Sequence, residues 1–231
     1  MSRKTSRPSR SKTPTVLIVD DHEVVRKGLA QAIEDAPEFE LAAEADGRRQ
    51  ALAACAEATP DLAIIDLSLE GDSGLELVKD LHVKYPRLGI MVLSMHDETL
   101  FAERSLRAGA KGYVEKSKGI AQVLDALRQI LAGQIAISHR MASRLLERLT
   151  GSGPEDAASP IESLSDRELE VFELIGRGYG TQDIADCLRL SPRTVDGHRE
   201  KIKHKLHVEN AVELHQHAFL WVQQQGGGPG A

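Results

Sequence analysis

Five short apolar runs, each followed by a stretch of helical period, constrain the fold of residues 15–130 more than any other feature. The runs cover residues 15–19, 40–43, 62–65, 88–93 and 112–114. Several are continuous rather than alternating, which is typical of strands buried on both faces of a parallel sheet. Helical spacing is clearest in Val24, Val25, Leu29, Ala32 and Ile33, and in Leu75, Leu77, Val78 and Leu81. This alternation predicts a doubly wound α/β domain with a five-stranded parallel sheet.

The second half of the chain shows no strand-like alternation. Residues 151–160 are rich in Gly, Pro, Ser and acidic residues, as linkers are, and residues 165–222 predict four short helices. We therefore expect a disordered basic tail over 1–14, the α/β domain over 15–133 and a connector helix with linker over 134–163. A small all-α domain follows over 164–223, and a disordered tail over 224–231.

Composition excludes several classes of protein. No apolar run approaches the roughly 20 residues that cross a bilayer, so no membrane association is expected. The basic N-terminus lacks the apolar segment of a secretory signal. Cys55 and Cys187 fall in different predicted domains, which disfavours a disulfide framework and predicts a cytoplasmic protein. The formal net charge of −6 gives no sign of nucleic-acid binding for the whole chain, so charge has to be read locally.

Acidic residues follow two of the predicted strands. Asp20 and Asp21 come directly after the first strand, and Asp66 comes after the third. The carboxyl ends of parallel strands open onto the ligand crevice, so these carboxylates converge if the two strands are neighbours. Three carboxylates repel one another unless a cation lies between them, and such oxygen ligands suit Mg²⁺. The sequence therefore predicts a Mg²⁺ site at this edge.

Two further polar residues fall at the same edge, because Ser94 ends the fourth strand and Lys116 follows the fifth. A divalent ion, an ammonium group and a hydroxyl around one aspartate form a receptor for a phosphoryl group, with Asp66 as the nucleophile. Any one of these residues alone is more simply explained as a helix cap. All five at successive strand ends favour a phosphoryl site.

Four segments carry a resemblance to a known family, namely residues 19–22 (Val-Asp-Asp-His), 65–67 (Ile-Asp-Leu), 92–95 (Val-Leu-Ser-Met) and 109–116. They resemble the receiver domain of two-component response regulators, which implies a flavodoxin-like fold. The resemblance implies that Asp66 accepts phosphate from a histidine kinase. It also implies that Asp20, Asp21 and the backbone carbonyl of Ser68 bind Mg²⁺ together with Asp66. Lys116 would contact the phosphate, and Ser94 and Tyr113 would form a switch pair. For Tyr113 a plain role in the core stays open.

Other phosphate chemistries fit this chain less well. The consensus of a P-loop is absent, and the first strand runs into acids instead of the glycine-rich turn of a dinucleotide fold. A phosphatase of the haloacid-dehalogenase type needs an acid two residues after its nucleophile, where this chain has Ser68. We therefore expect no enzyme, and a Mg²⁺-dependent phosphatase is the least favoured alternative.

Capping signals divide the second half into helices. Ser165 and Glu168 form a capping box, Thr181 is a second N-cap candidate, and Ser191 with Pro192 begins a third helix. The turn between the second and third of these helices is short, as in a helix-turn-helix. On a wheel, the third helix has one apolar stripe, formed by Val195, Ile202 and Leu206. Its opposite face carries Arg193, Gly197, Glu200, Lys201 and His204, with Arg199, Lys203 and Lys205 at the flanks.

The third helix is also locally basic, with five basic and two acidic residues between positions 192 and 206. This is an electrostatic footprint for phosphates, although a solvated basic face explains the charge equally well. A second set of residues, spread over this half of the chain, carries a resemblance to a known family. It comprises residues 164–168, Val171, Gly178, 183–185, Leu188, 191–195, His198, Ile202, 205–206, Ala211 and 213–214. These residues resemble the LuxR-type helix-turn-helix, and both halves together resemble the NarL/FixJ class of response regulators.

This second resemblance implies sequence-specific binding of double-stranded DNA and control of transcription. The residues expected to contact DNA are Thr181, Arg193, Thr194, Gly197, His198, Lys201 and Lys205. In the last helix Ala211, Leu214, Ala218, Leu220 and Trp221 imply a homodimer contact, with packing inside the domain as the alternative. Two acids, Asp196 and Glu200, depart from the expected groove surface. They keep a second hypothesis open, in which the chain is a protein-interaction module with weak or no specific DNA readout.

Overall fold

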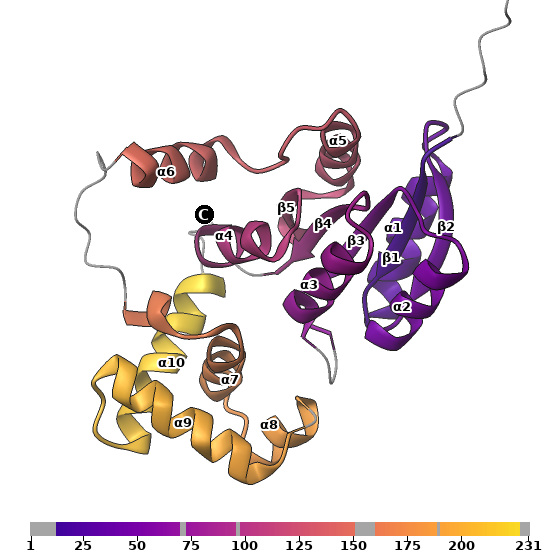
Figure 1. Cartoon of the computed structure of the whole chain (residues 1–231). Coiled ribbons are helices and arrows are strands. Elements are labelled where there is room, and N and C mark those ends of the chain that lie inside the picture. Colours follow the sequence, from indigo (N-terminus) through magenta and orange to yellow (C-terminus); the bar gives the residue numbers. More distant parts are fainter. Residues whose placement is uncertain (1–12, 70–72, 96–97, 151–159, 189, 227–231) are drawn as a thin grey trace, which may run out of the picture.

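The computed structural model describes residues 13–69, 73–95, 98–150, 160–188 and 190–226. Of the predicted disordered tails (1–14 and 224–231) and the predicted linker, residues 1–12, 227–231 and 151–159 lie outside the described residues. The C-terminal tail was predicted to begin too early, because the last helix continues to Gly226. The described part forms an α/β unit followed by a helical unit (Figure 1). Among these residues, no helix is both long and apolar enough to span a lipid bilayer.

The α/β unit contains a five-stranded sheet in the order β2-β1-β3-β4-β5. The strands are β1 (Thr15–Val19), β2 (Glu40–Ala45), β3 (Leu62–Asp66), β4 (Gly89–Ser94) and β5 (Gly112–Glu115). All four neighbouring pairs are parallel. The prediction of a five-stranded parallel sheet is confirmed. β1 and β3 are neighbours, so the ends of both open at the same edge of the sheet.

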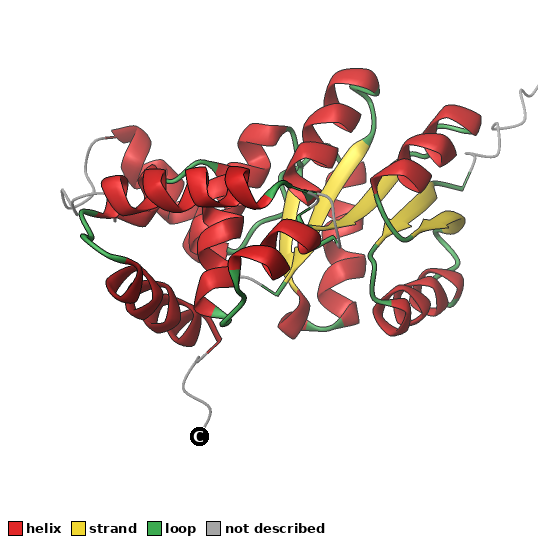
Figure 2. Cartoon of the chain, turned by 90° about the horizontal axis from the view of Figure 1, so that it is seen from below, coloured by secondary structure: helices red, strands yellow, loops and turns green. Residues whose placement is uncertain are grey.

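Helices cover both faces of this sheet (Figure 2). They are α1 (Glu23–Glu34), α2 (Arg48–Glu57), α3 (Gly74–Lys84), α4 (Glu98–Ala108) and α5 (Ile120–Leu131). Successive residues of β1 enter different cores: Val16 and Ile18 pack with α1 and α5, whereas Leu17 and Val19 pack with α2, α3 and α4. Side chains on both faces are buried because helices lie on both, which explains the continuous apolar runs.

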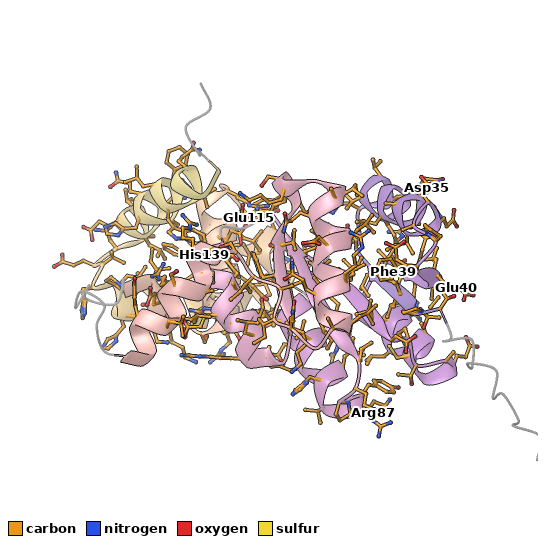
Figure 3. The ribbon with its side chains drawn as sticks, turned by 90° about the horizontal axis from the view of Figure 1, so that it is seen from above. Asp35, Phe39, Glu40, Arg87, Glu115 and His139 are labelled. Carbon is orange, nitrogen blue, oxygen red and sulfur yellow. The ribbon has the colours of Figure 1, made fainter. Side chains whose placement is uncertain are left out.

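The helical spacing was read incorrectly at one position of α1. Val24 was expected to face inward with Leu29 and Ile33, but it is 86% exposed. It lies in the first turn of α1, before the part of the helix that packs on the sheet, and the buried residues begin at Leu29. Beyond α1 the chain turns back into the core at Phe39, which is buried, while Asp35 and Glu40 stay at the surface (Figure 3).

The connector begins beside the edge strand β5. The amide of Tyr113 donates to the carbonyl of Ala136 over 2.8 Å, and the amide of Ala136 donates to the carbonyl of Lys111 over 2.8 Å. A Cβ at Gly112 would lie 3.0 Å from the Cβ of Ala136, so a small residue suits this close approach. The connector then forms α6 (His139–Thr150), in which Met141 is buried. The prediction of a helix in this segment is confirmed.

The helical unit contains a short 3₁₀ turn, η2 (Pro160–Ser163), and four helices. These are α7 (Asp166–Gly176), α8 (Thr181–Cys187), α9 (Pro192–Leu206) and α10 (Ala211–Gly226). Its core includes Phe172 and Trp221, whose ring centroids lie 5.6 Å apart. A Cβ at Gly176 would lie 2.3 Å from the carbonyl oxygen of Ala218, so α7 and α10 approach closely only because this residue is glycine.

Two of the predicted helix starts are confirmed, and one is wrong. Ser165 and Glu168 form the capping box of α7, and Ser191 caps α9 with Pro192 in its first turn. Thr181, however, is the first residue of α8 and does not cap it, because Gly180 takes the extended N-cap conformation. The carboxylate of Asp183 accepts from the amide of Gly180 over 3.1 Å, which is the bond that the third helical residue makes in a capping box.

Candidate functional site

Three carboxylates meet where β1 and β3 end. Asp20 and Asp66 are almost fully buried, with 1% and 2% of their surfaces exposed, and Asp21 lies beside them, partly buried. One ligand atom from each of these residues and from His22 lies within 4.8 Å of the others. Carboxylate oxygens of this kind are the donors that Mg²⁺ prefers, so the chemistry of the set fits a divalent cation.

Lys116, directly after β5, neutralises part of this charge. Its Nζ lies 2.7 Å from Oδ2 of Asp66 and 2.8 Å from Oδ2 of Asp20. Burial opposes the charge on Lys116, but the carboxylates of Asp66 and Asp20 outweigh that effect and raise the pKa of the ammonium. Lys116 is therefore a fixed positive charge in contact with the carboxylate of Asp66.

Asp66 sits in an environment unlike that of a surface acid. Burial raises the pKa of its carboxyl above the usual range, and the ammonium of Lys116 offsets only part of that rise. The amide of Ser68 donates to Oδ1 of Asp66 over 3.3 Å, while Oδ2 faces Lys116. The ionised carboxylate is thus held by directed donors in a largely dehydrated place, which orients an oxygen for attack on a phosphoryl group.

Ser94 and Tyr113 lie on the neighbouring strands. Ser94 ends β4 at the same edge as Asp66 and is fully buried. Tyr113 on β5 pairs in register with Val92, two residues before Ser94, and only 3% of its surface is exposed. The structure therefore brings Asp20, Asp21, Asp66, Ser94 and Lys116 to one edge of the sheet and places Tyr113 in the core behind it.

Arg26 was not among the predicted site residues, yet it supports the acidic pair. Its Nη1 donates to the backbone carbonyl of Asp20 over 2.6 Å, and its Nε lies 3.4 Å from Oε2 of Glu44. The segment that carries Asp20 is thereby fixed to α1 and β2. The sequence offered no signal for this contact, since an arginine in the first turns of an amphipathic helix is ordinary.

The outer face of α9 is open to solvent. Val195, Ile202 and Leu206 are buried as predicted. The opposite face is exposed and comprises Arg193, Thr194, Gly197, Glu200, Lys201 and His204. Nothing lies within 4 Å of a Cβ built at Gly197, so this position leaves room for a surface to approach the helix. The arrangement is that of a basic helix presented for contact with an anionic partner.

Comparison with known proteins decides what these two units are. The model of the response regulator receiver domain matches residues 16–128, and that of bacterial regulatory proteins of the luxR family matches residues 162–218. The response regulator GacA of Pseudomonas aeruginosa is 35% identical over 199 residues, which cover 86% of this chain and 92% of GacA. UvrY of Escherichia coli K12 is 33% identical over 199 residues, covering 86% of this chain and 90% of UvrY.

The chain belongs to the NarL/FixJ class of response regulators.

Solved structures of this class have the same architecture. RcsB from Salmonella enterica serovar Typhimurium, bound to promoter rprA with phosphomimetic BeF3−, matches with a TM-score of 0.64 and 25% identity. The match covers 90% of this chain and 99% of that one. Another structure shows two RcsB dimers bound to two parallel DNAs, with a TM-score of 0.55 and 26% identity over 91% of this chain and 99% of that one. This response regulator thus joins a receiver domain to a LuxR-type DNA-binding domain and regulates transcription.

Two residues expected to contact DNA are engaged inside the LuxR-type domain. Nζ of Lys205 lies 2.7 Å from Oε2 of Glu168 and 2.9 Å from the carbonyl oxygen of Ser163. His198 is half-buried, and its Nδ1 has no hydrogen-bond partner among the described residues. Burial lowers the pKa of His198, with the charge of Lys201 acting in the same direction. Neither side chain projects freely from α9 as Arg193 and Lys201 do.

The two acids on α9 are paired within the domain. Oδ1 of Asp196 accepts from the hydroxyl of Thr181 over 3.3 Å, and Arg199 donates to the same hydroxyl over 3.3 Å. Glu200 lies 2.8 Å from Nζ of Lys203. Asp196 therefore joins α9 to the start of α8, and Glu200 is matched by a neighbouring cation. Both acids therefore have partners inside the domain although both remain exposed.

Proposed function

We propose that Asp66 is the residue through which this response regulator receives its signal. A carboxylate oxygen of Asp66 attacks the phosphorus of a phosphohistidine on a histidine kinase. The P–N bond breaks, its electron pair stays with the imidazole, and an acyl phosphate forms on Asp66. The observation that carries the proposal is the contact of Lys116 with both Asp66 and Asp20, because it leaves a fixed ammonium beside the attacking oxygen.

The other residues at the edge hold the phosphoryl group and its counterion. Asp20, Asp21, Asp66 and the backbone carbonyl of Ser68 would hold Mg²⁺, which neutralises phosphoryl oxygens when bound. The ammonium of Lys116 then pairs with a phosphoryl oxygen instead of a carboxylate, and the hydroxyl of Ser94 donates to another. Movement of Ser94 toward the phosphoryl group would open space for Tyr113, which gives the receiver two states.

The acceptor is tested by intact mass after exposure to a small phosphoryl donor with Mg²⁺. The wild-type chain gains one phosphoryl group, and Asp66→Asn gains none. Asp46→Asn is the matched control, because Asp46 follows β2 at the same edge of the sheet but is exposed. An acid-labile phosphoryl group on Asp66→Asn would contradict the assignment.

We propose that the exposed face of α9 enters the major groove, where Arg193, Thr194, Gly197 and Lys201 meet the bases and backbone. Thr181 contributes at the start of α8, and we assign His198 and Lys205 to positioning α9. Leu214, Ala218 and Trp221, also expected at a homodimer contact, are buried within the domain, so the exposed apolar side chains of α10, Val212, Phe219 and Leu220, are proposed to pair two copies. Two copies predict an operator with two half-sites, about 10 base pairs or a multiple of that apart.

Capture of genomic fragments at moderate salt tests this part, with and without Mg²⁺ and beryllofluoride as a phosphoryl mimic. A small set of sites enriched more strongly with the mimic is expected. Arg193→Ala should relax the preference at one base position, whereas Lys201→Ala should weaken all sequences and reduce the salt slope by about 1 if it contacts a phosphate. The absence of any enriched site for the wild-type chain would contradict the DNA proposal.

A further inference from the structure

The two domains meet along one side of α7, at its N-terminal end. Figure 1 shows α7 below α3 and α4 of the receiver, with α9 on the far side of α7 from the sheet. Asp166 and Glu170, one helical turn apart, face the receiver: the former meets Lys79 and Arg104, the latter the hydroxyl of Ser73. The receiver therefore contacts the DNA-binding domain on the side of α7 that faces away from α9, the recognition helix proposed to enter the major groove.

Asp166 of the DNA-binding domain bonds to two cations of the receiver. Its Oδ2 lies 2.9 Å from Nζ of Lys79 on α3, and its Oδ1 lies 2.9 Å from Nη1 of Arg104 on α4. Burial raises the pKa of Asp166, but Lys79 and Arg104 outweigh burial and lower it below the usual range. Only 15% of the Arg104 side chain and 25% of the Asp166 side chain are exposed, so solvent screens this pair less than a surface pair.

Arg104 also binds the backbone that precedes α7. Its Nη2 donates to the carbonyl of Leu164 over 2.7 Å and to that of Glu162 over 3.2 Å. One guanidinium thus satisfies two backbone acceptors and one carboxylate of the DNA-binding domain. This fork of directed bonds fixes orientation as well as distance, which a lysine could not do.

Both cations stand on helices that directly follow the phosphoryl-binding strands. Lys79 lies on α3, which follows β3 and Asp66, and Arg104 lies on α4, which follows β4 and Ser94. At the start of α3, a Cβ on Gly74 would lie 2.3 Å from the carbonyl oxygen of Asp66. The start of α3 is thus packed against the backbone of Asp66, and Ser73, which caps that helix, faces Glu170.

The docked arrangement leaves the DNA-reading surface free. Arg193, Thr194, Gly197 and Lys201 are all exposed although α7 is held by the receiver. An interface that blocked DNA binding by covering α9 would bury these side chains. The contact is therefore suited to hold the DNA-binding domain in a fixed orientation with its recognition helix facing outward.

We propose that Asp166, held by Arg104 and Lys79, is a positioning clamp that orients the DNA-binding domain for paired half-sites and couples this orientation to Asp66. The inference rests on the proposed function, because it assumes phosphoryl transfer to Asp66 and DNA binding by α9. A fixed orientation raises the effective concentration of the second α9 helix at its half-site once two copies of the chain associate. Without the bonds of Arg104 and Lys79 to Asp166, each DNA-binding domain moves relative to its receiver, and the effective concentration at the second half-site falls.

The test uses the full-length chain as wild type, Arg104→Met and Arg107→Met. Arg107 is the matched control, since it lies on the same helix, is 78% exposed and pairs with Glu103 of its own helix. DNA affinity is measured with Mg²⁺ and beryllofluoride on a single half-site and on a paired site found by genomic capture. We expect Arg104→Met to bind the paired site about tenfold more weakly, with single-site affinity unchanged, and Arg107→Met to match the wild type.

Other outcomes overturn the clamp. Tighter binding by Arg104→Met without beryllofluoride would make the contact a mask, and unchanged binding at both sites would give it no role. An equal loss at the single half-site would show that the receiver shapes α9 itself. Failure of the wild-type chain to select any site would instead refute the proposed function. A carbodiimide cross-link between Lys79 and Asp166 checks the docked state directly; its absence in the wild type would also overturn the clamp.

Discussion

Lys205, on the recognition helix, donates a hydrogen bond of 2.7 Å to Oε2 of Glu168, the third residue of α7. The same oxygen of Glu168 accepts from the amide of Ser165 over 2.8 Å, so one carboxylate closes the capping box and anchors α9. Burial raises the pKa of Glu168, but Lys205 and Ser165 outweigh it and lower the pKa. Glu168 is therefore ionised and satisfied at neutral pH.

Removing Lys205 should destabilise the DNA-binding domain. Lys205→Met leaves the carboxylate of Glu168, 6% exposed, without its cation, which costs about 1–3 kcal/mol. Urea unfolding followed by fluorescence of Trp221, the single tryptophan, reports this domain. Lys201→Met, on the exposed side of the same helix, should leave the unfolding midpoint unchanged. Equal midpoints for both variants would show that the Lys205–Glu168 bond contributes nothing.

Glu173 should make the stability of the same domain depend on pH. Burial raises the pKa of Glu173 to about 7, and its ion pair with Arg177 only partly opposes the rise. Between pH 4.5 and about 7 the native state holds a proton that the unfolded state has released, so stability falls as the pH rises through this window.

Glu173→Gln removes that dependence. The difference in the free energy of unfolding, variant minus wild type, should increase by about 2–3 kcal/mol from pH 5 to pH 8, again measured through Trp221. Glu200→Gln is the control, because the side chain of Glu200 is 71% exposed. A wild-type pH slope that persists in Glu173→Gln would refute the assignment.

A methyl group at Gly74 should disturb the phosphoryl site. The added Cβ would lie 2.3 Å from the carbonyl oxygen of Asp66 and 2.5 Å from Cα of Leu67, and these backbone atoms cannot turn aside. Gly74→Ala should therefore cost about 1–3 kcal/mol and slow phosphorylation. Gly28→Ala, within α1 with nothing within 4 Å, should instead stabilise the fold by about 1 kcal/mol. Circular dichroism during unfolding separates the two; a neutral Gly74→Ala would contradict the close packing.

Mg²⁺ should stabilise the receiver through the acidic pair. A ligand that binds only the native state adds about 2.7 kcal/mol at one hundred times its dissociation constant. We expect the thermal midpoint of the wild type to rise with Mg²⁺ and that of Asp21→Asn to rise far less. Asp46→Asn, which alters an exposed acid at the same edge, should respond as the wild type does. An undiminished response in Asp21→Asn would exclude that residue as a metal ligand.

The architecture could be predicted from the sequence because its signals are local. Continuous apolar runs identified the buried strands, and Ser165 and Ser191 marked the starts of α7 and α9. The residues that converge on Asp66 were also predictable, since parallel strands bring their carboxyl ends to one edge. Val24 and Thr181 were misread because a periodic pattern does not fix where packing or capping begins.

Contacts between distant parts of the chain left no such signal. Arg104 and Asp166 are 62 residues apart, and each looks like an ordinary charged residue of a helix surface. Lys205 likewise looked like a DNA contact, because its place on the wheel says nothing of the carboxylate of Glu168 beside it. Such pairings depend on how packed elements face one another, which a helical wheel or a strand pattern does not contain.

The connector along β5 bears on how the receiver behaves when it is produced alone. An uncovered edge strand is a template for intermolecular pairing and aggregation. Ala136 covers the edge of β5 through its hydrogen bonds with Tyr113 and Lys111. Two residues later, the amide of Ser138 donates to Oε1 of Glu98 over 2.8 Å. A receiver fragment cut before residue 134 would lose this cover and become prone to fibrillar association. Fragments that retain residue 138 keep the β5 edge covered.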